Sequence, residues 1–173
     1  MTVETHHVDS NDAFGKKVGL QAASLAVLLS LFTICAHRAH TETIVTGNES
    51  SNDWAHYQAK RIRDYQLEMN TDVLKLAAPK NSETEKTVED YARQRAKYRQ
   101  ELDEIKKDAE EKVQKGAVAH RKAWYFDLSE GMLEISLVLS SLYFLSHKKL
   151  FPLLGLLLGG VGTVVGLLGL LLR

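Results

Sequence analysis

The sequence contains one cysteine and two prolines among its 173 residues. Because Cys35 has no second thiol to pair with, an intramolecular disulfide is excluded, and so is a metal cluster built from cysteines. No proline occurs between residues 36 and 47, so a helix that begins earlier can continue through this stretch. Pro79, in contrast, predicts a helix end, because it disfavours the helical conformation at Ala78.

The sequence also lacks the motifs of common enzyme classes. It has no phosphate-binding glycine loop, no nucleophile elbow and no zinc-protease helix. We therefore expect no enzyme activity, no cofactor and no metal. The 22 basic and 22 acidic side chains balance, and in the middle of the chain they are interleaved. This pattern is typical of solvated helix faces and predicts no nucleic-acid partner.

Apolar residues are abundant, and they form three separate runs. Residues 18–36 carry no formal charge and, as a helix, would span about 28 Å, which matches the hydrocarbon core of a bilayer. Residues 128–147 and 150–172 form the other two runs. We predict a transmembrane helix for each run and a mobile polar tail for residues 1–17. No small-residue cleavage site follows the first run, so we expect it to stay in the mature protein.

Residues 37–127 are too polar to enter a bilayer, and their second half shows a helical repeat. Its members recur at alternating steps of three and four, which places them on one helix face. They are Val88, Tyr91, Arg95, Tyr98, Leu102, Ile105 and Ala109. A sparser repeat precedes them and consists of Trp54, Ile62, Tyr65, Met69, Val73 and Leu76. We predict that the two repeats face each other in an antiparallel coiled-coil hairpin with a turn near residues 79–82.

Local signals predict where the two arms of this hairpin begin. Residues 47–48, a glycine and an asparagine, indicate a break in the first helix, followed by an N-cap at Asn52 or Asp53. Ser82 with Glu85 three residues later is typical of a capping box. The predicted fold class is therefore all-α, with three transmembrane helices and a long helical hairpin between the first and the second.

Four charged or titratable residues stand out. Arg95 is a charge at a core-type position, so we expect an acidic residue of the facing helix near it. Glu134 lies about two turns inside the second run, where a carboxylate often serves ion or proton movement unless the span begins late enough to leave it among lipid headgroups. His37 and His40 share a helix face after the first run, which fits a metal site, a pH sensor or an interfacial polar collar.

The third run contains the most specific signal in the chain, a stripe of glycines on one helix face. The glycine stripe consists of Gly155, Gly159, Gly162, Gly166 and Gly169. It predicts close packing against another helix, either of a second protomer or of the same chain. Before the second run, Trp124, Tyr125 and Phe126 predict an aromatic anchor at the membrane interface.

Basic residues near the runs bear on orientation. With three spans, the N-terminal tail and the loop between the second and third spans share one side, which carries Lys16, Lys17, Lys148 and Lys149. Short lysine-rich loops favour the cytoplasm, which would put the hairpin in the periplasm of a diderm bacterium. Basic residues on the other side nearly balance this count: Arg38, Arg121, Lys122 and Arg173.

The stretch AHRAHTE after the first run and the stretch NDWAHYQAKRIRDYQLE further on resemble the bacterial family called domain of unknown function 4337 (DUF4337). The order of parts, one span, a charged helical insert and two closely spaced spans, is similar too. The resemblance covers most of the chain beyond about Lys16. It implies a bacterial source, and with the three runs it predicts a multi-pass inner-membrane protein. It implies no activity and points to positions for an interaction: His37, His40, Trp54, Tyr57 and Lys60.

Two functions fit these features. The first is a non-enzymatic membrane protein whose coiled-coil hairpin serves self-association, as a homo-oligomer, or scaffolds a protein partner. The alternative is an ion-conducting or proton-coupled membrane subunit that uses Glu134. In both, the lipid bilayer is a partner of the three apolar runs.

Overall fold

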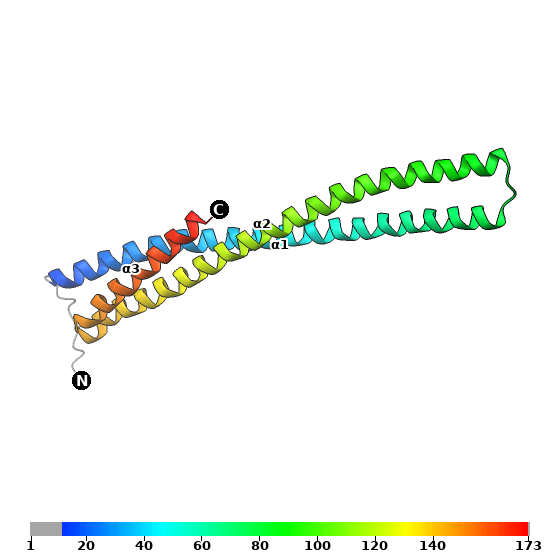
Figure 1. The fold of residues 1–173 in the computed structure, drawn as a ribbon. Helices are drawn as coiled ribbons and strands as arrows, with labels where there is room; N and C mark the ends of the chain where they lie inside the picture. Colours follow the sequence, from blue (N-terminus) through cyan, green and yellow to red (C-terminus); the bar gives the residue numbers. More distant parts are fainter. Residues whose placement is uncertain (1–11, 173) are drawn as a thin grey trace, which may run out of the picture. The chain divides into compact units, whose positions relative to one another are not determined.

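The computed structural model describes residues 12–172, and in this part of the chain every element is a helix. The helices are α1 (Ala13–Ala77), α2 (Ser82–Ser146) and α3 (Leu150–Leu171), drawn from blue to red in Figure 1. The predicted all-α class is confirmed. Each helix contains a stretch long and apolar enough, by length and composition, to cross a membrane.

The chain divides into two units. The first, called the three-helix unit, comprises Met1–Thr41 and Val118–Arg173, as far as these residues are described. The second, called the two-helix unit, comprises Glu42–Ala117. The first half of α1 and the second half of α2 thus pack with α3, whereas their other halves pack with each other.

The start of α1 differs from the prediction. Residues 1–11 of the predicted polar tail lie outside the described residues, but residues 13–17 are already helical. Asp12 is the reason, because its Oδ1 accepts hydrogen bonds from the N–H groups of Phe14 at 3.0 Å and Gly15 at 2.8 Å. This is the geometry of an N-cap, and the bond from Gly15 lowers the pKa of the Asp12 carboxyl.

The predicted break at residues 47–48 is wrong, because α1 runs without interruption to Ala77. No described glycine has a positive φ, so Gly47 keeps the helical conformation. A glycine inside a helix costs only about 0.5–1 kcal/mol relative to alanine. A single glycine is therefore too weak a signal to end a helix of this length.

The connection between α1 and α2 consists of residues 78–81, with Pro79 within it. The cap of α2 is not the predicted pair of Ser82 and Glu85. Asn81 takes this role, because its Oδ1 accepts a hydrogen bond from the N–H of Thr84 at 2.9 Å. Asparagine is as good an N-cap as serine, so the cap lies one residue earlier than the sequence pattern indicated.

Candidate functional site

The glycine stripe of α3 lies against the other two helices of its own unit. All five of its glycines are buried. A Cβ on Gly155 would lie 2.8 Å from the carbonyl oxygen of Ser136, and one on Gly166 would lie 2.5 Å from a ring carbon of Phe32. The stripe therefore allows α3 to approach α2 and α1 to a distance that any side chain would prevent.

The surface of α2 that receives the stripe is a row of small polar residues. The serine row consists of Ser129, Ser136 and Ser140, each with no exposed surface. Ser136 Oγ donates a hydrogen bond to the carbonyl oxygen of Gly155, and Ser140 Oγ donates to the carbonyl oxygen of Ser136 at 2.9 Å. Serine and glycine together thus allow close contact along part of this surface, whereas Gly162 and Gly169 lie against larger side chains of α2, Leu133 and Phe126.

A side chain of α1 extends this polar contact to all three helices. Gln21 Nε2 donates to Ser140 Oγ at 3.1 Å and to the carbonyl oxygen of Pro152 at 3.0 Å. At the other end of the row, Ser129 Oγ is buried without a hydrogen-bond partner among the described residues. An apolar cluster that includes Leu25, Phe32 and Leu133 completes the core of the three-helix unit.

Polar side chains also meet along one edge between α1 and α2, and we call them the polar edge. His40 Nε2 lies 3.0 Å from Asp127 Oδ1, and Thr33 Oγ1 donates to Glu130 Oε1 at 2.8 Å. Glu134 follows Glu130 by one helical turn and is exposed, as is His37. The structure therefore pairs His40 but leaves His37 and Glu134 on the outside of this unit.

Asp127 and Thr33 were missed by the sequence reasoning. Each becomes visible only when the register between α1 and α2 is known, because the antiparallel helices bring together residues that are about 90 positions apart. A single recognised ion pair between the helices would have fixed this register. No group of three or more potential metal ligands occurs among residues 12–172.

The three predicted aromatic anchors have different environments. Trp124 is 57% exposed, whereas Phe126 is buried and stacks on Phe32 with ring centroids 6.3 Å apart. Tyr125 is half-buried, and its Cβ would lie 3.0 Å from a Cβ added to Gly169. Only Trp124 thus has the outward position that an interface anchor needs, and Phe126 belongs to the core.

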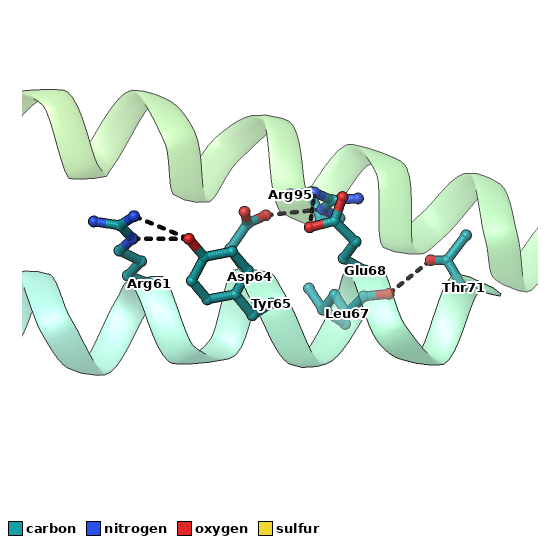
Figure 2. A network of polar contacts seen from close by, with 7 residues as sticks. All are labelled: Arg61, Asp64, Tyr65, Leu67, Glu68, Thr71 and Arg95. Atoms are coloured by element: carbon teal, nitrogen blue, oxygen red, sulfur yellow. Dashed lines mark hydrogen bonds and ion pairs between the residues drawn. The ribbon is translucent and has the colours of Figure 1, made fainter. Parts of the chain in front are cut away.

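In the two-helix unit, the face of α2 that points to α1 is the predicted one. The residues of the repeat from Val88 to Ala109 are all buried or half-buried. The expected acidic partner of Arg95 is confirmed, because Asp64 Oδ1 lies 2.9 Å from its Nε and Glu68 Oε2 lies 3.0 Å from its Nη2 (Figure 2). The hydrogen bond to Asp64 raises the pKa of Arg95, so the guanidinium stays charged.

The predicted face of α1 is wrong. Its inward positions follow alternating steps of four and three but are mostly polar, and we call them the polar seam. The polar seam consists of Thr46, Ser50, Asp53, Tyr57, Lys60, Asp64, Leu67, Thr71 and Leu74, all buried or half-buried. Hydroxyl groups on this seam bond to backbone carbonyls, as Ser50 Oγ does to Ala109 at 3.2 Å.

Ion pairs explain why the polar face of α1 points inward. Lys60 Nζ bonds to Glu101 Oε2, and Lys112 Nζ lies 2.7 Å from Asp53 Oδ2. These bonds lower the pKa of Glu101 and raise the pKa of Lys112. With the pair of Arg95 and Asp64, they connect the helices at three levels and fix an antiparallel register. A face made of Ile62 and its apolar neighbours would leave all three α2 charges without partners on α1.

Of the six residues predicted for the seam, Trp54 is half-buried, and the other five lie outside the seam, on a surface that we call the outer stripe. Its exposed fractions are 57% for Ile62, 53% for Tyr65, 63% for Met69, 56% for Val73 and 89% for Leu76. Figure 2 shows Arg61 bonded to the Tyr65 hydroxyl, at 2.9 Å from its Nη2. The outer stripe is thus a continuous apolar helix face that the rest of the two-helix unit does not cover.

The comparisons with known proteins give one result. The family model described as "Domain of unknown function (DUF4337)" matches residues 14–172, which is nearly the whole chain. No curated protein and no solved structure matches the chain.

Proposed function

Since the chain belongs to the DUF4337 family, whose description assigns no activity, we propose a function from its own residues. It is a non-enzymatic integral membrane protein whose two-helix unit, an antiparallel coiled-coil hairpin, binds a second copy of the same chain through the outer stripe. The exposure of that stripe is the observation that carries this proposal.

The surface and the core of the three-helix unit support insertion into a bilayer. Most side chains on the outside of α3 are large and apolar, with Leu156, Leu157 and Leu170 more than half exposed. In water such a surface would drive aggregation, but in lipid it is the expected exterior. The core contact of glycines and serines is also typical of membrane helices, where lipid removes the hydrophobic drive between helices.

The outer stripe supports self-association because its apolar side chains stay exposed in a single copy. Exposed valine and leucine would each gain about 1.5–3 kcal/mol from full burial. Copies anchored in one membrane share their orientation, and each has the stripe at the same sequence distance beyond the first apolar run. Two parallel neighbours can therefore cover each other's stripes, and confinement to the membrane raises their effective concentration.

The lysines that flank the spans support a periplasmic side for the hairpin, although Arg38, Arg121, Lys122 and Arg173 on the other side nearly balance them. Lys16, Lys17, Lys148 and Lys149 favour a cytoplasmic N-terminus and a cytoplasmic loop between α2 and α3. The hairpin would then lie in the periplasm of a diderm bacterium, attached to the inner membrane. Alkaline phosphatase fused at Lys80 would be active in this topology and inactive in the reverse one.

Native mass spectrometry of the full chain from nanodiscs tests the association. We expect a dimer for the wild type, and a dissociation constant at least tenfold higher for Met69→Gln/Val73→Gln, because glutamine keeps the helix but removes the apolar contact. The matched control is Lys97→Gln, which changes an exposed α2 residue of the same unit.

Three outcomes would contradict self-association through the outer stripe. The wild type could be a monomer at all concentrations, the double variant could remain as dimeric as the wild type, or the control could dissociate equally. A complex with one copy of another protein, lost in the double variant, would assign the stripe to a heterologous partner instead.

Glu134 supports a second candidate, a proton-coupled or ion-conducting subunit. The side chain is exposed on the outside of the three-helix unit, beside Glu130 and Thr33 on the polar edge. A carboxylate facing lipid is costly, so this position favours a second copy that shields it from lipid. Proton flux into liposomes that Glu134→Gln abolishes would support this function. Equal flux in the variant, or none in the wild type, would rule it out.

A further inference from the structure

A groove of about 550 Å³ lies on the outside of the three-helix unit, between α1 and α3. Its walls are mostly apolar, and they include Leu20, Leu25 and Leu28 of α1 and Leu156 of α3. Ser24 and Thr163 also line it, but their hydroxyls donate to the carbonyl oxygens of Leu20 and Gly159 within their own helices. The groove therefore offers an apolar ligand a wall with no unpaired hydroxyl group.

One charged residue lines the groove, and it lies at one end. Lys17 directly precedes the first apolar run, whereas Leu28 lies eleven residues further along α1. At 1.5 Å per residue the distance along the helix is about 16 Å, comparable to an extended acyl chain of a phospholipid. Among the described residues, Lys17 forms no ion pair.

The surroundings of Lys17 are basic. Lys16 is adjacent in sequence, and Lys148 and Lys149 lie in the short connection between α2 and α3. Lys149 also lies over the ring of Phe14, with its Nζ 5.3 Å from the centroid. The nearest described carboxylate in sequence, Asp12, is engaged by the backbone of α1 and by the Tyr143 hydroxyl at 3.0 Å. This end of the groove thus favours a negatively charged group.

We propose that this groove binds one anionic phospholipid, with an acyl chain along the leucines and the phosphate at Lys17. The inference rests on membrane insertion of the three-helix unit, which belongs to the proposed function, but not on self-association. A lysine at the end of a span reaches the level of the headgroups with its ammonium, while its methylenes stay on apolar surface. The same groove and charge predict a preference for anionic over zwitterionic lipid.

The chain offers a matched pair of glycines for the test. A Cβ at Gly160, which lines the groove, meets no atom within 4 Å, and the same holds for Gly19, which does not line it. Gly160→Leu therefore adds a large side chain at the groove from a Cβ that has open space, and Gly19→Leu is its control. Lys17→Gln removes the charge at the groove, and Lys148→Gln removes a nearby charge outside it.

Native mass spectrometry of the delipidated full chain with phosphatidylglycerol or phosphatidylcholine measures the binding. We expect one retained phosphatidylglycerol, bound at least fivefold more tightly than phosphatidylcholine. Lys17→Gln should reduce this preference to near parity, whereas Gly160→Leu should weaken the binding of both lipids about tenfold. Gly19→Leu should bind as the wild type does, and Lys148→Gln, which removes a charge outside the groove, should lose much less of the preference than Lys17→Gln.

Equal binding of the two lipids by the wild type would overturn the proposal. So would a Gly160→Leu variant that binds like Gly19→Leu, or a Lys148→Gln variant that loses as much preference as Lys17→Gln. Occupation of the groove by a second copy would appear as a dimer that Gly160→Leu dissociates and added lipid displaces. A chain that is soluble without detergent would contradict membrane insertion and therefore the proposed function. This result is distinct from a membrane protein that fails to bind the lipid.

Discussion

The three-helix unit and the two-helix unit are built from the same two long helices, α1 and α2, but their contacts differ in kind. In the three-helix unit, glycines and serines bring the backbones together, and large leucines point outward. In the two-helix unit, ion pairs and hydroxyl groups lie between the helices, and apolar side chains of α1 also point outward.

This difference indicates that apolar exposure has a different cause in each unit. Outward leucines in the three-helix unit fit a lipid solvent, which needs no further protein. The outward apolar stripe of the two-helix unit belongs to a segment too polar to enter a bilayer, and in the proposed function a second copy of the chain covers it. Variants at the helix contacts of each unit test this difference, and their expected effects on the free energy of unfolding decrease from the three-helix unit to the outer stripe.

Gly155→Val should have the largest effect, because its Cβ would lie 2.6 Å from Ser140 Oγ and 2.8 Å from the backbone carbonyl oxygen of Ser136, which cannot move aside as a flexible side chain can. We expect a loss of about 3 kcal/mol or more in the free energy of unfolding of the three-helix unit. The matched control is Gly160→Val, which has open space and should lose much less. Unfolding in mixed micelles measures both, and equal losses would show that the stripe is not a packing surface.

Asp64→Ala should cost about 1–3 kcal/mol in the two-helix unit, because it leaves Arg95 largely buried without its closest acceptor. Replacing both residues by leucine should recover most of this loss. Glu89→Ala removes an exposed partner of Arg93 and should cost no more than about 0.5 kcal/mol. Hydrogen exchange of the full chain measures all three, and a loss for Glu89→Ala equal to that for Asp64→Ala would contradict this account.

The stability of the two-helix unit should depend on pH at both extremes. The pKa of Glu101 is lowered in the folded chain, so its contribution is complete above about pH 5 and is lost as the pH falls through the folded pKa. The pKa of Lys112 is raised, so its contribution is complete below about pH 10 and is lost as the pH rises through the folded pKa. Helix content followed by circular dichroism should fall at both ends, and Glu101→Gln should remove part of the acid response.

Tyr65→Gln in the outer stripe should have the smallest effect within one copy, because the side chain is already half exposed. We expect a change of at most about 0.5 kcal/mol in the unfolding of the two-helix unit when the protein is monomeric in excess detergent. A large loss under these conditions would mean that the outer stripe is part of the core of its own unit.

The sequence predicted the helices well and their facing surfaces only in part. Apolar runs, Pro79 and the repeat of α2 each follow from local periodicity, which a single sequence displays directly. The inward face of α1 does not, because Ile62 and Met69 form a more apolar helical face than Asp64 and Thr71. The face of α1 that packs against α2 is determined by charges of α2 some thirty or more residues away, such as Arg95.

The candidate site residues show the same division. The glycine stripe is visible in the sequence as a local spacing, but its partner, the serine row, becomes identifiable only in the folded unit. His40 was visible as part of a histidine pair, yet its contact with Asp127 required the register between α1 and α2. The signals at Gly47 and Ser82 mislead for local reasons, because one glycine costs a helix little and Asn81 competes with Ser82 as the N-cap.

The central claim is that the polar seam of α1, and not its apolar face, packs against α2. It is tested most directly by a disulfide between the two helices of the two-helix unit. A Cβ at Gly116 would lie 3.7 Å from the Cβ of Thr46 on the polar seam, which is ideal for a disulfide. In a Cys35→Ser background, Thr46→Cys/Gly116→Cys should oxidise readily within one chain, whereas Ile44→Cys/Gly116→Cys should not, because Ile44 is 63% exposed. Rapid oxidation of the Ile44 pair and none of the Thr46 pair would show that the apolar face of α1 is the inner one, which would contradict this claim.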